Sequence, residues 1–158
     1  MKSEKFEEWL ERNELSLKCK PRTQRASYIE FFEGEFKGDK VSKFQRGEVY
    51  FAKLTKSAKT RPFLIYQNNY LNEACFEGIY HTVVVLPLSG QILNGDYRVF
   101  IKKRDLMVCD SEIVTNAIGI ISTGKILFSK GIVTKLTDEE MQKVNNAVMK
   151  VIGVDFAI

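Results

Sequence analysis

Residues 60–68 read Thr-Arg-Pro-Phe-Leu-Ile-Tyr-Gln-Asn, and this stretch decides how the rest of the chain is interpreted. The apolar run at 63–66 lies between turn-forming residues, which is typical of a buried β-strand. Pro62 fits the start of a strand, because its missing N–H then lies at the edge of the hydrogen-bonded ladder. The strand would hold Arg61 at its mouth, where the donor fork of a guanidinium suits a phosphate. A surface ion pair is the alternative role for this arginine.

The sequence on either side of this stretch predicts further short strands. We expect one strand over Glu48–Leu54, with Val49, Phe51 and Leu54 on one face, and a central β-branched strand over Thr82–Leu86. Three more strands are expected over 97–102, 112–115 and 118–122, and a helical turn over 70–76. Many short strands indicate a mainly β fold that closes into a small barrel.

The two ends of the chain differ from this β-rich part. At the C-terminal end, Thr137 and Glu140 form a capping box that predicts a helix ending at Gly153. Residues 1–44 predict a helical N-terminal extension, and residues 45–158 predict the barrel domain. The apolar helical face at 6–10 is expected to pack on the core, because an exposed Phe, Trp and Leu patch needs a partner.

Composition limits the class of protein. The chain has 158 residues, enough for one domain, and its net charge of +4 permits a nucleic-acid partner without requiring one. No apolar run is long enough to span a bilayer and no signal region is present, so we expect a cytoplasmic protein without a membrane partner. Cys19, Cys75 and Cys109 show neither metal spacing nor a disulfide framework, and Cys109 is expected to fill a core site.

Several catalytic patterns are missing from the sequence. The single histidine, His81, leads into the Val-rich strand, and no zinc-ligand spacing or nucleotide-binding glycine motif occurs. Ser89 lies outside a G-x-S-x-G elbow. We therefore expect that any catalysis uses neither metal nor cofactor and relies on arginine, Ser or Thr hydroxyls, and a carboxylate.

Five segments occur in a set order over residues 45–153. They are Arg46–Tyr50, Thr60–Asn68, Thr82–Ser89, Asp110–Ile113 and Lys130–Val144. Their order and spacing resemble those of the MazF/PemK family of toxin endoribonucleases. Each segment alone is a weak signal, but the five together indicate this family.

The resemblance implies an SH3-like small barrel with a C-terminal helix, a homodimer and a cognate antitoxin. It also implies metal-independent cleavage of single-stranded RNA, in which the ribose 2′-OH attacks the adjacent phosphate and leaves a 2′,3′-cyclic phosphate and a 5′-OH. The family's R-P arginine falls on Arg61 and its strand-end Thr or Ser falls on Ser89, which makes these two the candidate catalytic residues. Candidate RNA-binding residues are Lys56, Lys59, Gln67 and Glu48.

The sequence also departs from the family pattern. The family's Q-x-R-T-x-D segment corresponds here to residues 116–122, where the Gln, Arg and acidic positions are lost and Asn116 cannot act as a base. One alternative is therefore a non-catalytic RNA-binding module on the same fold. A gyrase poison like CcdB is another, although residues 154–158 lack a terminal Trp. A structural interaction module built around the N-terminal extension is a third.

Overall fold

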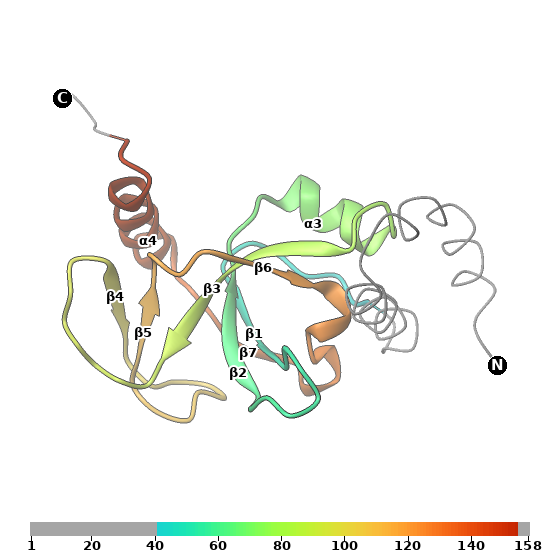
Figure 1. Cartoon of the computed structure of the whole chain (residues 1–158), viewed down its shortest axis with the longest axis horizontal. Coiled ribbons are helices and arrows are strands. Elements are labelled where there is room, and N and C mark those ends of the chain that lie inside the picture. Colours follow the sequence, from blue (N-terminus) through green and yellow to red (C-terminus); the bar gives the residue numbers. More distant parts are fainter. Residues whose placement is uncertain (1–40, 155–158) are drawn as a thin grey trace, which may run out of the picture.

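The computed structural model describes residues 41–154, in which seven strands form one curled sheet with a helix at its C-terminal end (Figure 1). The predicted face at 6–10 and Cys19 lie outside the described residues. The strands are β1 (Glu48–Ala52), β2 (Arg61–Ile65), β3 (Thr82–Ser89), β4 (Arg98–Ile101), β5 (Ser111–Val114), β6 (Gly119–Ser122) and β7 (Ile132–Lys135). The helices are α3 (Asn69–Phe76) and α4 (Asp138–Val151), and two 3-10 turns are η1 (Thr123–Lys125) and η2 (Phe128–Lys130). Among the described residues, no helix has both the length and the apolar character that a membrane span requires.

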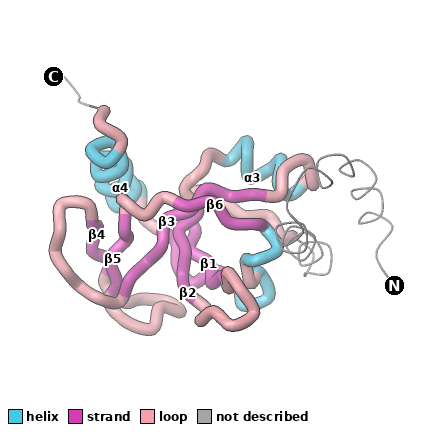
Figure 2. The backbone as a smooth tube through the Cα atoms, in the orientation of Figure 1, coloured by secondary structure: helices cyan, strands magenta, loops and turns pink. Residues whose placement is uncertain are grey.

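Strand β3 organises the sheet. All its pairings are antiparallel: it pairs with β2 along one edge, and along the other edge first with β6 and then with β5. The strand order is β4-β5-β3-β2-β1-β7, with β6 beside the first half of β3. Because one long strand carries two different partners on the same edge, the sheet bends along β3 into a half-barrel (Figure 2).

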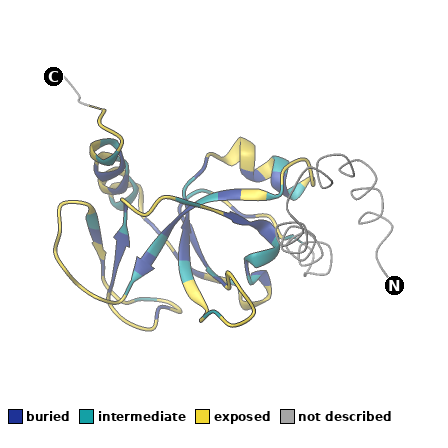
Figure 3. Cartoon of the chain, viewed as in Figure 1, coloured by how far each residue is buried: buried dark blue, intermediate teal, exposed yellow. Residues whose placement is uncertain are grey.

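The sheet is buried on both faces, because successive side chains of a strand point to opposite sides. One cluster, the helix-side core, joins Leu64, Leu86 and Ile113 to Val144 and Val148 of α4. The second core lies on the opposite face and is formed by residues including Tyr50, Phe63, Ile65, Val83, Cys75 and Phe128. The strands that carry these buried residues run through the middle of the molecule (Figure 3). Phe44, the last residue of the predicted extension, is buried in the second core and stacks on Phe128.

The predicted mainly β fold with a C-terminal helix is confirmed, with differences at element ends. Strand β1 ends at Ala52, so Leu54 lies beyond it with 43% of its surface exposed. Strand β3 does not end at Pro87 but continues through it to Ser89. Strand β7 was not predicted from the sequence, because its four residues follow a 3-10 turn and only two of them are buried. The helical turn at 70–76 is an eight-residue helix capped by Asn68.

Helix α4 begins at the predicted capping box, and an ion pair between Arg104 and Glu140 reinforces it. Thr137 Oγ1 accepts from the Glu140 amide at 3.2 Å, and Glu140 Oε2 accepts from the Thr137 amide at 2.9 Å. Arg104 also donates to both Glu140 oxygens at 2.7 Å and to Thr134 Oγ1 at 3.1 Å. The hydrogen bond from Arg104 lowers the pKa of Glu140 despite partial burial, which acts in the opposite direction. The pair ties the loop before β5 to the helix start.

We expect Glu140→Gln to destabilise the fold at neutral pH but not in acid. Gln keeps the capping box, whereas the charged pair with Arg104 is lost, which costs about 1 kcal/mol for partly exposed groups. Because the folded-state pKa of Glu140 is lowered, its contribution is full above the unfolded pKa of about 4.3 and is lost as pH falls through the folded value. Urea unfolding of both proteins should therefore give different stabilities at pH 7, and the difference should shrink as the pH falls below the unfolded pKa. A difference that stays the same size throughout the acid range would contradict this assignment.

Candidate functional site

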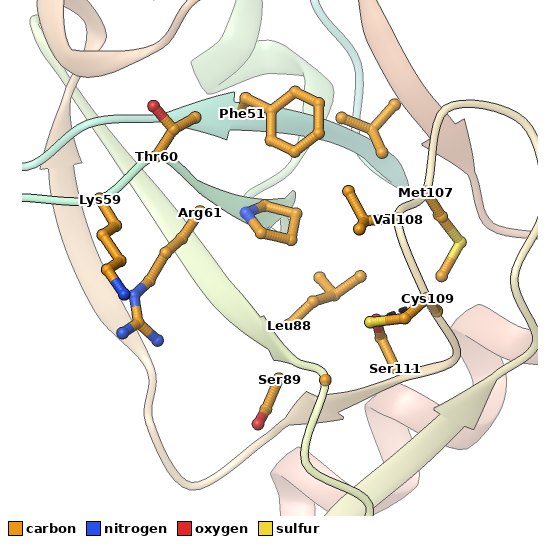
Figure 4. Close-up of a pocket in the computed structure, with 13 residues that line it drawn as sticks. Phe51, Lys59, Thr60, Arg61, Leu88, Ser89, Met107, Val108, Cys109 and Ser111 are labelled. Carbon is orange, nitrogen blue, oxygen red and sulfur yellow. Dashed lines mark hydrogen bonds between the residues drawn. The ribbon is translucent and has the colours of Figure 1, made fainter.

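A pocket of about 260 Å³ opens where the N-terminal end of β2 meets the C-terminal end of β3 (Figure 4). Its floor is apolar and includes Pro62, Leu88, Met107 and Val133. Its other lining residues are Phe51, Lys59, Thr60, Arg61, Ser89, Gly90, Val108, Cys109 and Ser111. The pocket therefore combines an apolar base with cations and hydroxyls at its rim.

Arg61 is the first residue of β2, where it pairs with Ala52 of β1. The β2–β3 ladder pairs Phe63 with Pro87 and continues toward Ile65 and Val85. Arg61 and Ser89 each lie two residues beyond the Phe63–Pro87 pair, and both line the pocket. The start of β2 and the end of β3 thus bring a guanidinium and a hydroxyl, 28 positions apart in sequence, to the rim of one pocket.

Ser89 is the last residue of β3 and is half-buried. Its Oγ accepts a hydrogen bond from the Gln91 amide at 3.2 Å. A hydroxyl has one donor hydrogen and two acceptor lone pairs, so this contact leaves its hydrogen available to a ligand oxygen. Arg61, which is exposed, presents a planar fork of donors from the neighbouring strand. Together they form a site that suits an anion with several oxygens, such as a phosphate.

One predicted lysine lines the pocket, and one lysine that was not predicted lies beside a residue that lines it. Lys59 lines the pocket, as Arg61 does (Figure 4). Lys130, at the end of η2, was not predicted, and its Nζ lies 5.8 Å from the centre of the Phe51 ring that lines the pocket. Lys56 is exposed in the same loop as Lys59 but outside the lining residues.

The other two predicted RNA-binding residues are not brought to the pocket. Glu48 is buried and accepts hydrogen bonds from the Gln45 amide and the Tyr50 hydroxyl, both at 2.9 Å. Burial, together with the Glu48 carboxylate, raises the pKa of Tyr50. Gln67 is also buried, where it donates to Asn72 at 2.9 Å and accepts from the Val84 amide at 3.0 Å. Both polar side chains make internal hydrogen bonds, so neither belongs to the site at the pocket.

The prediction that Cys109 fills a core site is wrong. Cys109 is exposed and lines the pocket, with its Sγ against Gly90 at the end of β3. A Cβ at position 90 would lie 2.9 Å from this sulfur, so a side chain there would require the Cys109 thiol to shift. The wall formed by residues 107–111 was missed because nothing in its sequence indicates that the turn after β4 folds back over β3.

The described lining residues include no Asp, Glu or His. Asn116, at the position of the family's acid, is exposed in the turn between β5 and β6 and does not line the pocket. Over residues 41–154, no group of three or more His, Cys, Asp or Glu side chains is placed to hold a metal ion. The pocket can therefore bind and polarise a phosphate by charge and hydrogen bonds from its own side chains.

The fold and the pocket together define a small, mainly β protein with cationic side chains around a pocket at the edge of a half-barrel sheet. A family model described as the PemK-like, MazF-like toxin of type II toxin–antitoxin systems matches residues 45–152, which is more than half of the chain. The chain belongs to this toxin family. Among curated proteins, no sequence matches it.

Solved structures agree with this assignment at the level of the fold. An endoribonuclease in complex with its cognate antitoxin, from a mycobacterial species, has a TM-score of 0.59 at 20% identity, covering 72% of this chain and 98% of that one. The Mycobacterium tuberculosis toxin MazF-mt6 gives 0.57 at 15%, covering 69% and 99%. A MazE–MazF structure from Deinococcus radiodurans gives 0.56 at 11%, covering 72% and 99%.

Proposed function

We propose that this chain is the toxin of a type II toxin–antitoxin pair and cleaves single-stranded RNA without a metal ion. The observation that supports this proposal is the pocket where β2 meets β3, which Arg61, Ser89 and Lys59 all line. Family membership supports the toxin role. Single-stranded RNA offers the phosphates that these cations suit and unstacked bases that an apolar floor can accept.

The proposed reaction is an internal transfer at one phosphate. The ribose 2′-oxygen forms a bond to phosphorus, the bond from phosphorus to the 5′-oxygen breaks, and the products are a 2′,3′-cyclic phosphate and a 5′-hydroxyl. Negative charge grows on the non-bridging oxygens in between, where Arg61 and the Ser89 hydroxyl stabilise it. Because arginine stays protonated, we assign Arg61 to charge stabilisation. In this proposal solvent accepts the proton of the 2′-hydroxyl and donates a proton to the leaving 5′-oxygen.

The remaining parts of the proposal concern assembly and place of action. We propose a cognate antitoxin as partner, in line with the mycobacterial endoribonuclease, which was solved in complex with its cognate antitoxin, and with the MazE–MazF structure from Deinococcus radiodurans. A homodimer and a cytoplasmic location are further parts of the proposal. The free thiols of Cys75 and Cys109 fit a reducing compartment.

One assay tests the function directly. Purified full-length protein is incubated with varied single-stranded RNAs in EDTA, and the products are separated on a gel and probed for a 2′,3′-cyclic phosphate end. We expect cleavage that EDTA does not prevent. RNAs that stay intact under all conditions would refute the proposed activity.

A non-catalytic RNA-binding module is the second candidate. It is favoured by one observation, that the described lining of the pocket contains no carboxylate or imidazole to serve as a base. The same assay separates the two candidates when paired with a binding measurement. Binding of RNA without cleavage supports the second candidate, and cleavage excludes it.

Lys130→Ala is expected to weaken RNA binding without changing the chemistry. Lys130 lies over Phe51 at the pocket edge, so it can reach a phosphate next to the one at Arg61. For single strands each phosphate contact contributes about 0.7 to the slope of log affinity against log salt. Titration of a 2′-O-methyl RNA, which lacks the attacking hydroxyl, should show a slope shallower by about this amount. Lys150→Ala, in the last turn of α4, is the matched control, and an equal change in both variants would count against the contact.

A further inference from the structure

The buried carboxylate of Glu112 lies directly behind the proposed site. Its strand, β5, contributes Ser111 to the pocket lining, but Glu112 itself does not line the pocket. Glu112 of β5 is only 1% exposed, and it pairs with Ser89 in the β3–β5 ladder. A charged side chain this deeply buried needs hydrogen-bond partners, because desolvation without them is very costly. The partners of Glu112 therefore show what it is used for.

Two of these partners are backbone amides of the loop that follows Ser89. Glu112 Oε1 accepts from the Asn94 amide at 2.8 Å and from the Leu93 amide at 3.0 Å. Asn94 has a φ of 53°, a left-handed conformation that Asn tolerates better than most residues. The carboxylate thus holds a tight turn whose backbone would otherwise leave two donors without acceptors.

The third partner closes the loop from the other end. Arg98, the first residue of β4, donates to Glu112 Oε2 at 3.1 Å and to the Gln91 carbonyl at 3.2 Å. The Gln91 amide in turn donates to Ser89 Oγ at 3.2 Å. A continuous set of hydrogen bonds therefore runs from the buried carboxylate through the loop to the hydroxyl at the pocket.

We propose that Glu112 is a positioning residue for the RNA-cleaving site: it fixes the loop at 90–94 and, through Gln91, sets the direction of the Ser89 hydroxyl. This inference rests on the proposed function. Burial raises the pKa of Glu112, but the Asn94 amide, the Arg98 guanidinium and the Leu93 amide outweigh it and lower the pKa overall. The carboxylate is charged at neutral pH, as its role as an acceptor for three donors requires.

Three variants test the proposal. Glu112→Ala removes every acceptor. Glu112→Gln keeps one oxygen for the loop amides but turns an NH₂ group toward Arg98, so two donors face each other. Glu112→Gln combined with Arg98→Gln restores an acceptor for that NH₂ group and removes both charges.

Two readouts are measured on each full-length variant: hydrogen exchange of the Leu93 and Asn94 amides, and kcat and KM for RNA cleavage. For Glu112→Ala we expect faster exchange at both amides and a kcat lower by about 10- to 100-fold, since small misplacements of a site cost this much. KM should stay near the wild-type value, because Arg61 and the lysines are untouched. The double variant should recover most of kcat relative to Glu112→Gln.

Each unfavourable result has a distinct meaning. Unchanged exchange at Leu93 and Asn94 would show that Glu112 does not hold the loop. Faster exchange with unchanged kcat would show that the loop does not position Ser89, and either result overturns the inference. If Glu112→Ala does not fold, the comparison of Glu112→Gln with the double variant decides the same point. Wild-type protein that leaves RNA intact refutes the proposed function and with it the positioning role, whereas the exchange data still report the loop contact separately.

Discussion

Arg61→Ala is expected to lower the rate of RNA cleavage by about 10²–10³-fold, the usual cost of removing one preorganised donor at a site where charge develops. Arg61 contributes a permanent charge and a fork of donors at the pocket rim, and the described lining residues offer no carboxylate or imidazole that shares its work. The side chain is exposed, so its loss should change the free energy of unfolding by no more than about 0.5 kcal/mol. Initial cleavage rates and thermal unfolding, measured on the same preparations, check both parts.

Two further variants sharpen the result. Arg61→Lys keeps the charge but loses the planar fork, so it should recover only a small part of the lost rate. Ser89→Ala removes a neutral donor and should cost less than Arg61→Ala. If Arg61→Ala cuts RNA at the wild-type rate, the pocket is not the site of the reaction, whatever the protein does elsewhere.

The sequence predicted the two residues that meet at the pocket because a strand pattern and a family pattern agreed on them. The run at 63–66 identified β2, and the Val-rich run at 82–86 identified β3, so Arg61 and Ser89 were both expected at strand ends. That the ends adjoin depends on the register between the strands. Register is set by pairing across the sheet, which a single sequence does not display.

Other parts of the site could not be predicted, for physical reasons. Glu48 and Gln67 looked available because charged and amide side chains are usually exposed. Yet Glu48 accepts from the Gln45 amide and the Tyr50 hydroxyl, and Gln67 accepts from the Val84 amide. Cys109 looked like a core residue because free cysteine is often buried. Its exposure follows from the loop after β4, whose path over Gly90 is a tertiary contact without a local signal.

The role of Glu112 could not be predicted from the sequence either. In the sequence it is one acidic residue of a short strand, and nothing in its neighbours indicates burial. Only the fold shows that its carboxylate receives two amides from residues about twenty positions earlier and the guanidinium of Arg98. Long-range polar contacts of this kind therefore need a structure, whereas strand identity and the family pattern do not.

Leu64→Ala is expected to have the largest effect on stability, with a loss of about 2–5 kcal/mol. Leu64 is fully buried at the centre of β2, between β1 and β3, and belongs to the helix-side core that holds α4 on the sheet. Truncation removes apolar contacts and leaves a cavity that strands paired on both sides cannot easily close. Because small domains have only about 5–15 kcal/mol in total, urea unfolding should show a clearly lower midpoint.

Leu54→Ala is the matched control, since it makes the same chemical change in a leucine that lies past the end of β1 and is 43% exposed. We expect its free energy of unfolding to stay within about 0.5 kcal/mol of wild type. Below its unfolding midpoint, Leu64→Ala should still cleave RNA, because Arg61 and Ser89 are positioned by the backbone ladder of β2 and β3 and not by this side chain. Equal destabilisation by both variants would mean that the centre of β2 is not the tightly packed core described above.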